Sequence, residues 1–118
     1  MTTDTLQLTQ EQSITFVTFS SACISDVDAI SEATDQLGRF IDTIHPAKMI
    51  FDFSGVKFFS SQVLGVLIET RAKISSYQGQ LALCCIAPQL KRVFSITNLD
   101  RIFSLAENRA DAMSILNS

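Results

Sequence analysis

Two short apolar segments, 48–53 (KMIFDF) and 80–87 (QLALCCIA), limit the possible folds more than any other feature of this chain. Each has the length of a strand and is almost continuously apolar, which is typical of a strand covered on both faces. Between them, residues 63–76 place apolar side chains on one side of a helix, with Glu69 and Lys73 as an i, i+4 pair on the other side. Strands that alternate with helices in this way favour a mostly parallel sheet with crossover helices.

The rest of the chain supplies the remaining elements of the same layered architecture. Residues 5–10 and 13–19 alternate as two strands that can pair locally, whereas 24–44 repeats every three or four residues as an amphipathic helix capped by Ser25 or Asp26. The later elements are a helix at 88–97 with Pro88 in its first turn and Asn98 after its end, a strand at 101–106, and a helix at 109–116 capped by Asn108. The sequence therefore predicts an α/β fold, with a mixed, mostly parallel sheet of about five strands and about four helices.

The length and composition favour one domain over residues 1–118. Of the 118 residues, 47% are hydrophobic and 18% are charged, so the chain has enough apolar area to bury a core. A net charge of -3 opposes nucleic-acid binding, which needs clustered Lys and Arg. The longest apolar runs fall far below the roughly 20 residues of a membrane span, and the N-terminal segment has no features of a secretory signal. We therefore expect a cytoplasmic protein with neither a nucleic-acid nor a membrane partner.

Residues that carry catalysis or bind metals are sparse in the sequence. The three cysteines, Cys23, Cys84 and Cys85, have no C-x-x-C spacing, and the single histidine, His45, precedes a proline at a predicted helix end. Burial in a strand explains the adjacent pair Cys84 and Cys85 as small hydrophobic residues. Asp52, near a strand end, is better explained as a hydrogen-bond acceptor than as a catalytic acid. We therefore predict no enzyme activity, no metal site and no cofactor.

The segment 57–71 (KFFSSQVLGVLIETR) contains the polar groups that point to regulation. Ser60 and Ser61 lie where the second helix should begin, so one hydroxyl can accept a hydrogen bond from a free amide, which is worth about 1 kcal/mol. The same free amides and the positive end of the helix dipole also tolerate a phosphate group. A serine at this position can therefore be a helix cap, a regulatory switch or both.

Four segments together resemble the signature of the STAS domain, the family of bacterial anti-sigma-factor antagonists and sulphate-transporter tails. They are DFSGV at 52–56, FFSSQVLG at 58–65, YQGQLAL at 77–83 and ITNLDRIF at 96–103. Their order and spacing agree with the family pattern from about residue 14 to the C-terminus. The resemblance implies a STAS-like fold for nearly the whole chain.

The resemblance also implies a residue-by-residue match at the start of the second helix. In antagonists of this family, a partner that is both serine kinase and anti-sigma factor phosphorylates the serine that corresponds to Ser61. Leu64 and Gly65 match the pattern, and Asn98 replaces a later Gly. The other departures are Ser60 for an acidic residue, Gln62 for Ser or Thr, and Val63 for Gly.

Three interpretations of function remain open. The favoured one is a non-enzymatic antagonist, a monomer or weak dimer, that binds an anti-sigma factor or serine kinase and is switched by phosphorylation at Ser61. The second is a phosphorylation-independent STAS adaptor or scaffold in a signalling complex, and the third is an enzyme or small-ligand carrier. In the first, phosphate on Ser61 opposes docking, and Gly65 permits close approach of the partner backbone. The expected partner-binding residues are Phe58, Phe59, Ser60, Gln62, Val63 and Gly65.

Overall fold

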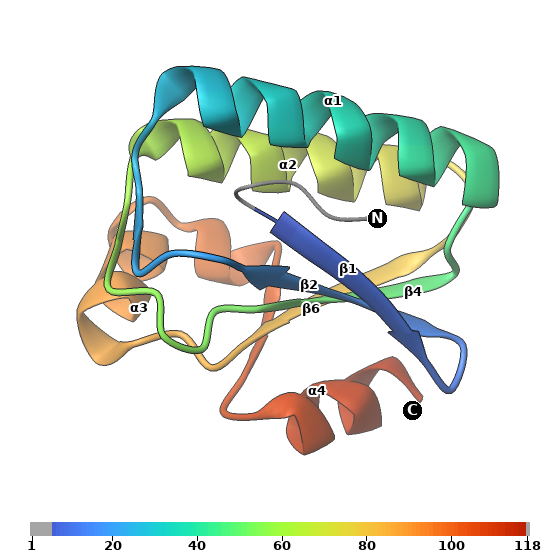
Figure 1. The fold of residues 1–118 in the computed structure, drawn as a ribbon. Coiled ribbons are helices and arrows are strands. Elements are labelled where there is room, and N and C mark those ends of the chain that lie inside the picture. Colours follow the sequence, from blue (N-terminus) through green and yellow to red (C-terminus); the bar gives the residue numbers. More distant parts are fainter. Residues whose placement is uncertain (1–5, 118) are drawn as a thin grey trace.

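The computed structural model describes residues 6–117, and its centre is a sheet of five strands (Figure 1). In spatial order the strands are β1 (Leu6–Glu11), β2 (Ile14–Phe19), β4 (Lys48–Asp52), β6 (Gln80–Cys84) and β7 (Ser104–Ala106). β1 runs antiparallel to β2 and all other neighbours are parallel, which confirms the predicted mixed sheet. Thr5, which was predicted to start the first strand, lies outside the described residues.

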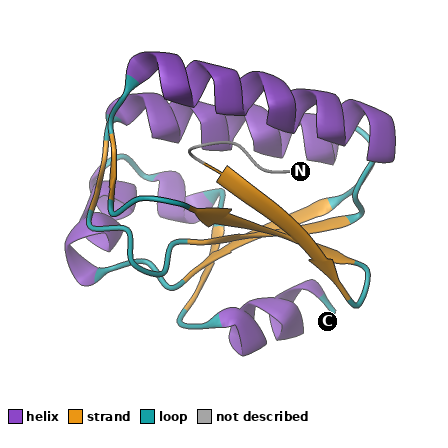
Figure 2. Ribbon diagram, in the orientation of Figure 1, coloured by secondary structure: helices purple, strands orange, loops and turns teal. Residues whose placement is uncertain are grey.

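Within residues 6–117, four α-helices cover the two faces of the sheet (Figures 1 and 2). They are α1 (Val27–Ile44), α2 (Ser61–Ser75), α3 (Pro88–Ile96) and α4 (Arg109–Leu116). α1, α2 and α3 bury their apolar sides against one face, in a cluster with Val17 and Phe51 of the strands. α4 covers the other face, in a second cluster with Ile50 and Ala82. Every helix of the described chain is too short or too polar to span a bilayer.

The apolar runs of the sequence are explained by this cover on both faces. Along β4, Met49 and Phe51 belong to the three-helix side, Ile50 belongs to the α4 side, and all three are at most 1% exposed. Because successive strand residues point to opposite faces, a strand buried on both sides needs an apolar residue at nearly every position. Asp52 is the polar exception and ends the strand.

Short-range signals mark the caps of α1 and α4 and both ends of α3 as predicted. The carboxylate of Asp26 caps α1 by accepting a backbone amide hydrogen bond of 3.0 Å, and the Asn108 side chain caps α4 with one of 2.8 Å. Pro88 occupies the first turn of α3, where its missing N–H costs no hydrogen bond. Asn98 follows α3 with a φ of 63°, a left-handed conformation that Gly and Asn adopt most readily. Asn therefore suits a position where the STAS pattern has Gly.

Three predicted boundaries are wrong. The strand predicted at 80–87 ends at Cys84, because Cys85 has a φ of 62°, which is not an extended conformation. α1 begins at Val27 rather than at residue 24, because Ile24 belongs to a two-residue strand, β3 (Cys23–Ile24), that pairs outside the main sheet. The predicted strand at 101–106 begins only at Ser104, because Leu99–Arg101 form a 3-10 turn. At Ile24 a pairing with the distant residue Phe59, and not the local pattern, decides the element.

Candidate functional site

A short two-stranded ribbon carries the phenylalanine pair into position. β5 (Phe58–Phe59) pairs in parallel with β3, so that Cys23 lies beside Phe58 and Ile24 beside Phe59. Because side chains alternate along a strand, one pair faces the core and the other faces out. Ile24 and Phe59 are buried, whereas Phe58 is 51% exposed. Phe59 therefore belongs to the core, whereas Phe58 lies at the surface.

A tight turn connects β4 to this ribbon. The amide of Val56 donates to the carbonyl of Phe53 at 3.0 Å, and Gly55 has a φ of 80°, which a type II turn requires at its third position. Asp52 fixes the start of the turn, because its Oδ1 accepts hydrogen bonds from the Ser54 amide at 2.8 Å and the Ser54 hydroxyl at 2.6 Å. The predicted role of Asp52 as a strand-end acceptor is confirmed.

Asp52 also ties the turn to the last helix. Its Oδ2 accepts a hydrogen bond of 2.6 Å from Nε of Arg109, the first residue of α4, whose guanidinium lies 4.4 Å from the ring centre of Phe16. Burial by itself would raise the pKa of Asp52, but the hydrogen bonds from Ser54 and Arg109 outweigh it and hold that pKa below its ordinary value. The hydrogen bond to Asp52 in turn raises the pKa of Arg109. The connection that precedes Ser61 is therefore anchored to α4.

The two serines at the start of α2 have different environments. Ser61 is the first residue of the helix and its side chain is exposed, whereas Ser60 occupies the N-cap position. Neither hydroxyl caps the helix in the described chain, and the Ser60 Oγ is buried without a hydrogen-bond partner. The predicted capping hydrogen bond is therefore wrong, because the backbone of Ser60, held by its amide to the carbonyl of Ile24 at 2.9 Å, points the hydroxyl inward. Ser61 is left as the accessible hydroxyl.

Of the next residues of α2, some pack against the rest of the protein and others are exposed. Gln62 donates from Nε2 to the Val27 carbonyl at 3.4 Å and to the Ser31 hydroxyl at 3.2 Å, which joins α2 to α1. Val63, which was expected to bind a partner, is only 4% exposed, because its position on the helix turns it into the core. Gly65 is exposed, and a Cβ added there would meet nothing within 4 Å.

The exposed residues around the start of α2 form a mixed surface, which we call the Ser61 surface. Ser61, Gly65 and Ile68 follow one another at helical spacing on the outer side of α2, and Ile68 is 44% exposed. Phe58 lies three residues before Ser61, and Val27, whose carbonyl binds Gln62, is 64% exposed. Of the residues predicted to bind a partner, Phe58, Gln62 and Gly65 lie on or beside this surface. The side chains of Phe59, Ser60 and Val63 support it from beneath.

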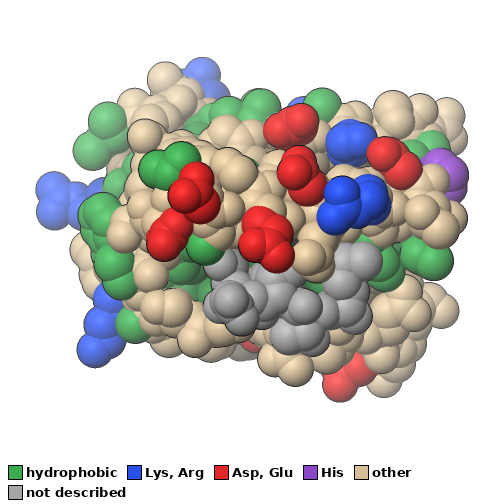
Figure 3. Space-filling view, turned by 45° about the horizontal axis from the view of Figure 1, so that its top comes forward, with side chains coloured by type: hydrophobic (Ala, Val, Ile, Leu, Met, Phe, Trp, Pro, Cys, Tyr) green, Lys and Arg blue, Asp and Glu red, His purple; other side chains and the backbone are tan. Residues whose placement is uncertain are grey.

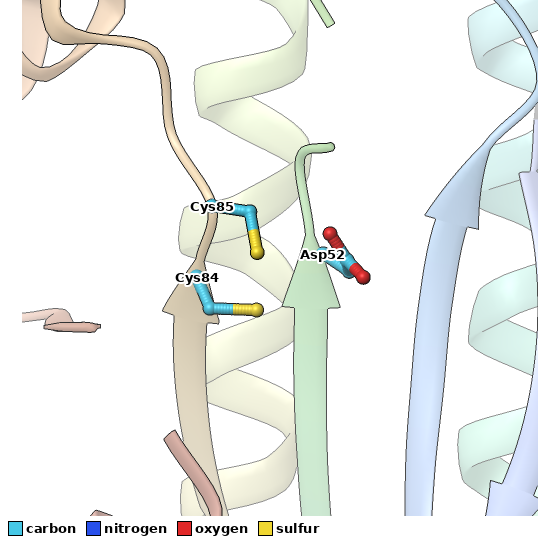
Figure 4. A group of neighbouring side chains, drawn as sticks. All are labelled: Asp52, Cys84 and Cys85. Carbon is cyan, nitrogen blue, oxygen red and sulfur yellow. The ribbon is translucent and has the colours of Figure 1, made fainter. Parts of the chain in front are cut away.

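A second group of chemistry-bearing residues lies at the ends of β4 and β6 (Figure 4). The side-chain donor atoms of Asp52, Cys84 and Cys85 all lie within 4.8 Å of one another. A cation fits this set poorly, because the Asp52 oxygens already bind Ser54 and Arg109, and the guanidinium of Arg109 would repel a metal ion. Burial, followed by contact with Cys85, raises the pKa of the Cys84 thiol far above its ordinary value. The cluster therefore has the character of a structural contact. The predicted burial in a strand is confirmed for Cys84, whereas Cys85 lies beyond the end of β6 and is partly exposed.

The Asp52–Arg109 contact is the site feature that sequence reasoning missed. The two residues are 57 positions apart, and no periodicity or motif links them. The available signal was an Asp that interrupts an apolar strand, since a buried carboxylate requires a donor or cation somewhere in the fold. This signal indicates that Asp52 has a partner, but it does not identify that partner.

Comparison with known proteins gives a family and several solved relatives. A family model described as the STAS domain matches residues 5–112. A candidate anti-sigma factor antagonist of Thermotoga maritima is 36% identical over 66 residues, which are 56% of this chain and 58% of that protein. The match thus spans little more than half the length of this curated relative.

Solved structures agree over nearly the full chain. An anti-sigma-factor antagonist (STAS) domain protein from Planctomyces limnophilus superposes with a TM-score of 0.85 at 22% identity, covering 96% of this chain and 98% of that one. The phosphorylated form of the Bacillus cell fate determinant SpoIIAA gives a TM-score of 0.72 at 15% identity, covering 92% of this chain and 96% of that one. At these identities the likeness concerns the fold, and it confirms the architecture predicted from the sequence.

Proposed function

Because this chain belongs to the STAS domain family, we propose that it is a non-enzymatic regulatory protein of the anti-sigma-factor-antagonist type. It binds an anti-sigma factor that is also a serine kinase, and phosphorylation of Ser61 ends that binding. Relatives of similar sequence carry the antagonist description, and SpoIIAA has been solved in both phosphorylated and unphosphorylated forms. These names support the proposal for this chain.

The exposed hydroxyl of Ser61 at the first position of a 15-residue helix is the observation that carries the proposal. A kinase needs an accessible acceptor, and the neighbouring hydroxyl, on Ser60, is buried. The first turn of α2 has free backbone amides and no acidic residue, so the helix dipole favours a phosphate there. Phosphorylation at Ser61 therefore changes the surface without opposing the fold.

Phosphate would act on binding through the apolar character of the Ser61 surface. It adds roughly -1.5 to -2 charge at pH 7, and a partner that covers Phe58 and Ile68 would have to strip water from that charge. A loss of about 3 kcal/mol in binding free energy corresponds to about a hundredfold weaker affinity. This is enough for a regulatory switch.

The test measures phosphorylation of this protein by a candidate anti-sigma-type serine kinase and its binding to that kinase. Mass spectrometry should find one phosphate, at Ser61, and none in the Ser61→Ala variant. Calorimetry with the kinase domain should show tight binding by the unmodified protein and about a hundredfold weaker binding by Ser61→Asp. Ser75→Asp, the same change at the far end of the same helix, is the matched control and should bind normally. Absence of phosphate on Ser61 together with normal binding by Ser61→Asp would refute the switch.

A second candidate is a phosphorylation-independent adaptor or scaffold of the same fold. It is favoured by Ser60, which stands where the STAS pattern has an acidic residue and whose hydroxyl is turned inward. No carboxylate then adjoins Ser61 in sequence to orient a kinase toward the acceptor hydroxyl. The adaptor interpretation predicts partner binding that is equal for Ser61→Ala, Ser61→Asp and the unmodified chain.

A further inference from the structure

The first strand, β1, forms one margin of the sheet. Within residues 6–117 it pairs only with β2, and it stands at the end of the strand order (Figure 1). The backbone groups on its outer side belong to an open edge, which can pair with a strand of another chain. Natural edge strands are usually protected against such pairing by shortness, by a bulge, or by Lys and Pro side chains.

The turn that follows β1 determines which of its backbone groups point outward. Gln12 and Ser13 have φ values of 52° and 68°, so they form a two-residue type I′ turn, and the two residues that flank it are a hydrogen-bonded pair. Hydrogen-bonded and non-bonded pairs alternate along an antiparallel ladder. Leu8 and Gln10 therefore direct their N–H and C=O groups away from β2. In the part of the chain that the structure describes, these outward groups have no hydrogen-bond partner.

β1 lacks the features that usually protect an edge strand. It is six residues long, contains neither Lys nor Pro, and pairs with β2 one residue to one, without a bulge. Its single charged side chain, Glu11, lies 3.9 Å from the guanidinium of Arg109 on α4 and is thus turned toward that face of the sheet. The opposite margin of the sheet differs, because β7 has only three residues. β1 is therefore the edge that is open to a further strand.

We propose that β1 pairs with β1 of a second copy of this chain, antiparallel and with Thr9 on the two-fold axis. In this register Leu8 of each copy lies opposite Gln10 of the other, and each of these pairs exchanges two hydrogen bonds. The outward groups of both residues are then satisfied in both copies. The strand is self-complementary about Thr9, as a two-fold interface requires. The two five-stranded sheets continue into one another.

The side chains of β1 are compatible with this register. Thr9 meets its counterpart at the axis, and Thr–Thr pairs across strands are favourable. Gln7 lies opposite the partner's Glu11, so an amide donor faces a carboxylate, and no two charges of the same sign oppose each other. Gln7 and Thr9 are exposed in the single chain, so the pairing needs no rearrangement of the fold.

The surface formed by α1 and α2 is less suited to self-association. Figure 3 shows acidic side chains gathered on this side of the molecule. A two-fold contact there would bring like charges together. The Ser61 surface shares no residue with β1, so a dimer formed through β1 leaves it open to a partner. Pairing through β1 thus goes beyond the proposed function and does not depend on it.

The strand contact is small, so the dimer should be weak. It consists of one pair of short strands, whereas stable specific interfaces usually bury about 1,200–2,000 Å². We expect a dissociation constant in the range of about 0.1–1 mM. The chain is then a monomer when dilute and pairs where its local concentration is high.

The test is the rotational correlation time of the ¹⁵N-labelled full chain, measured by NMR relaxation at concentrations up to about 2 mM. It should rise toward the value of a dimer, and the amide signals of Leu8 and Gln10 should shift with the same concentration dependence. Thr9→Lys places like charges face to face on the axis and should weaken the association at least about fivefold. Gln7→Lys, which adds the same charge opposite the partner's Glu11, is the matched control and should associate at least as well as the unmodified chain.

An exchange of charge tests the position of the axis. Thr9→Glu should also associate weakly by itself, whereas an equimolar mixture of Thr9→Glu and Thr9→Lys should associate more tightly than either variant. Gln10→Pro provides a test without charge, because it removes an outward N–H, leaves the hydrogen bonds to β2 in place and should remain monomeric.

Three results would overturn the inference. The first is a correlation time that does not change with concentration. The second is self-association that Thr9→Lys and Gln10→Pro leave unchanged, since a different surface would then be responsible. The third is a mixture of Thr9→Glu and Thr9→Lys that associates no better than its components, which would exclude Thr9 from the axis.

Discussion

The contact between Asp52 and Arg109 leads to a quantitative prediction for the variant Arg109→Gln. The substitution removes the 2.6 Å hydrogen bond to a carboxylate that is 5% exposed and leaves that carboxylate with Ser54 as its donor. It also removes the cation above the ring of Phe16. The free energy of unfolding should therefore fall, although the substitution leaves both helix α4 and its Asn108 cap intact.

The magnitude follows from the exposure of each partner. Loss of one member of a buried ion pair costs roughly 3–5 kcal/mol, but the Arg109 side chain is 37% exposed. Water can partly replace a donor that is so accessible, and screening reduces the loss to about 2 kcal/mol. The contact with Phe16 adds about 0.5–1 kcal/mol. We expect a total loss of about 2–3 kcal/mol.

Urea denaturation at pH 7, followed by circular dichroism, measures this change. Arg92→Gln is the matched control: Arg92 is exposed on α3 without a partner in the described chain, so its loss should change stability by less than about 0.5 kcal/mol. In an Asp52→Asn background, Arg109→Gln should cost at least about 1 kcal/mol less than in the unmodified chain. A loss below about 1 kcal/mol, or a loss independent of Asp52, would refute the assigned role of the pair.

Three further predictions concern stability at and near the site. Gly65→Ala should raise the free energy of unfolding by about 0.5–1 kcal/mol in urea denaturation; destabilisation would mean that the glycine serves the fold itself. Phe59→Ala should lower the free energy of unfolding by about 3–5 kcal/mol and Phe58→Ala by less than about 1 kcal/mol. If thermal melts showed similar losses for the two variants, the assigned burial of Phe59 and exposure of Phe58 would be contradicted. Because the pKa of Asp52 is lowered in the folded state, its stabilising contribution is complete above its unfolded pKa of about 3.9 and disappears as pH falls through the folded value. Acid titration monitored by fluorescence-dye binding should therefore show that stability falls less steeply with decreasing pH in Asp52→Asn. An unchanged pH dependence would show that the Asp52 carboxylate does not cause it.

The elements of this fold could be predicted because their signals are local. The apolar run of residues 48–53 already requires cover on two faces, and Asp26, Pro88 and Asn108 mark helix starts through contacts within three residues. Asn98 could be placed at a helix end for the same reason, since a left-handed backbone favours its short polar side chain. Signals of this kind need no knowledge of the tertiary structure.

The parts that could not be predicted depend on contacts between distant segments. The pairing of Cys23 with Phe58 decides which phenylalanine is exposed, and it joins segments 35 residues apart. The inward direction of the Ser60 hydroxyl follows from the same ribbon, through the hydrogen bond to Ile24. Glu69 was a plausible ion-pair partner of Lys73 by its spacing, but Lys73 pairs with Asp42 of the adjacent helix instead. Local spacing alone cannot rank such competing partners.

The ribbon also explains why the departures from the STAS pattern are compatible with the proposed docking surface. Ser60 and Val63 turn inward, and Gln62 reaches across to α1. The positions that keep their pattern residues and face outward, Ser61 and Gly65, are one helical turn apart on the same side of α2. The departures from the pattern therefore alter how α2 is held against its neighbours, while the Ser61 hydroxyl and the backbone at Gly65 stay exposed. An acidic residue at position 60 would place a charge where the Ser60 hydroxyl is now buried. The residue at this position therefore cannot be changed without also changing how the start of α2 is packed.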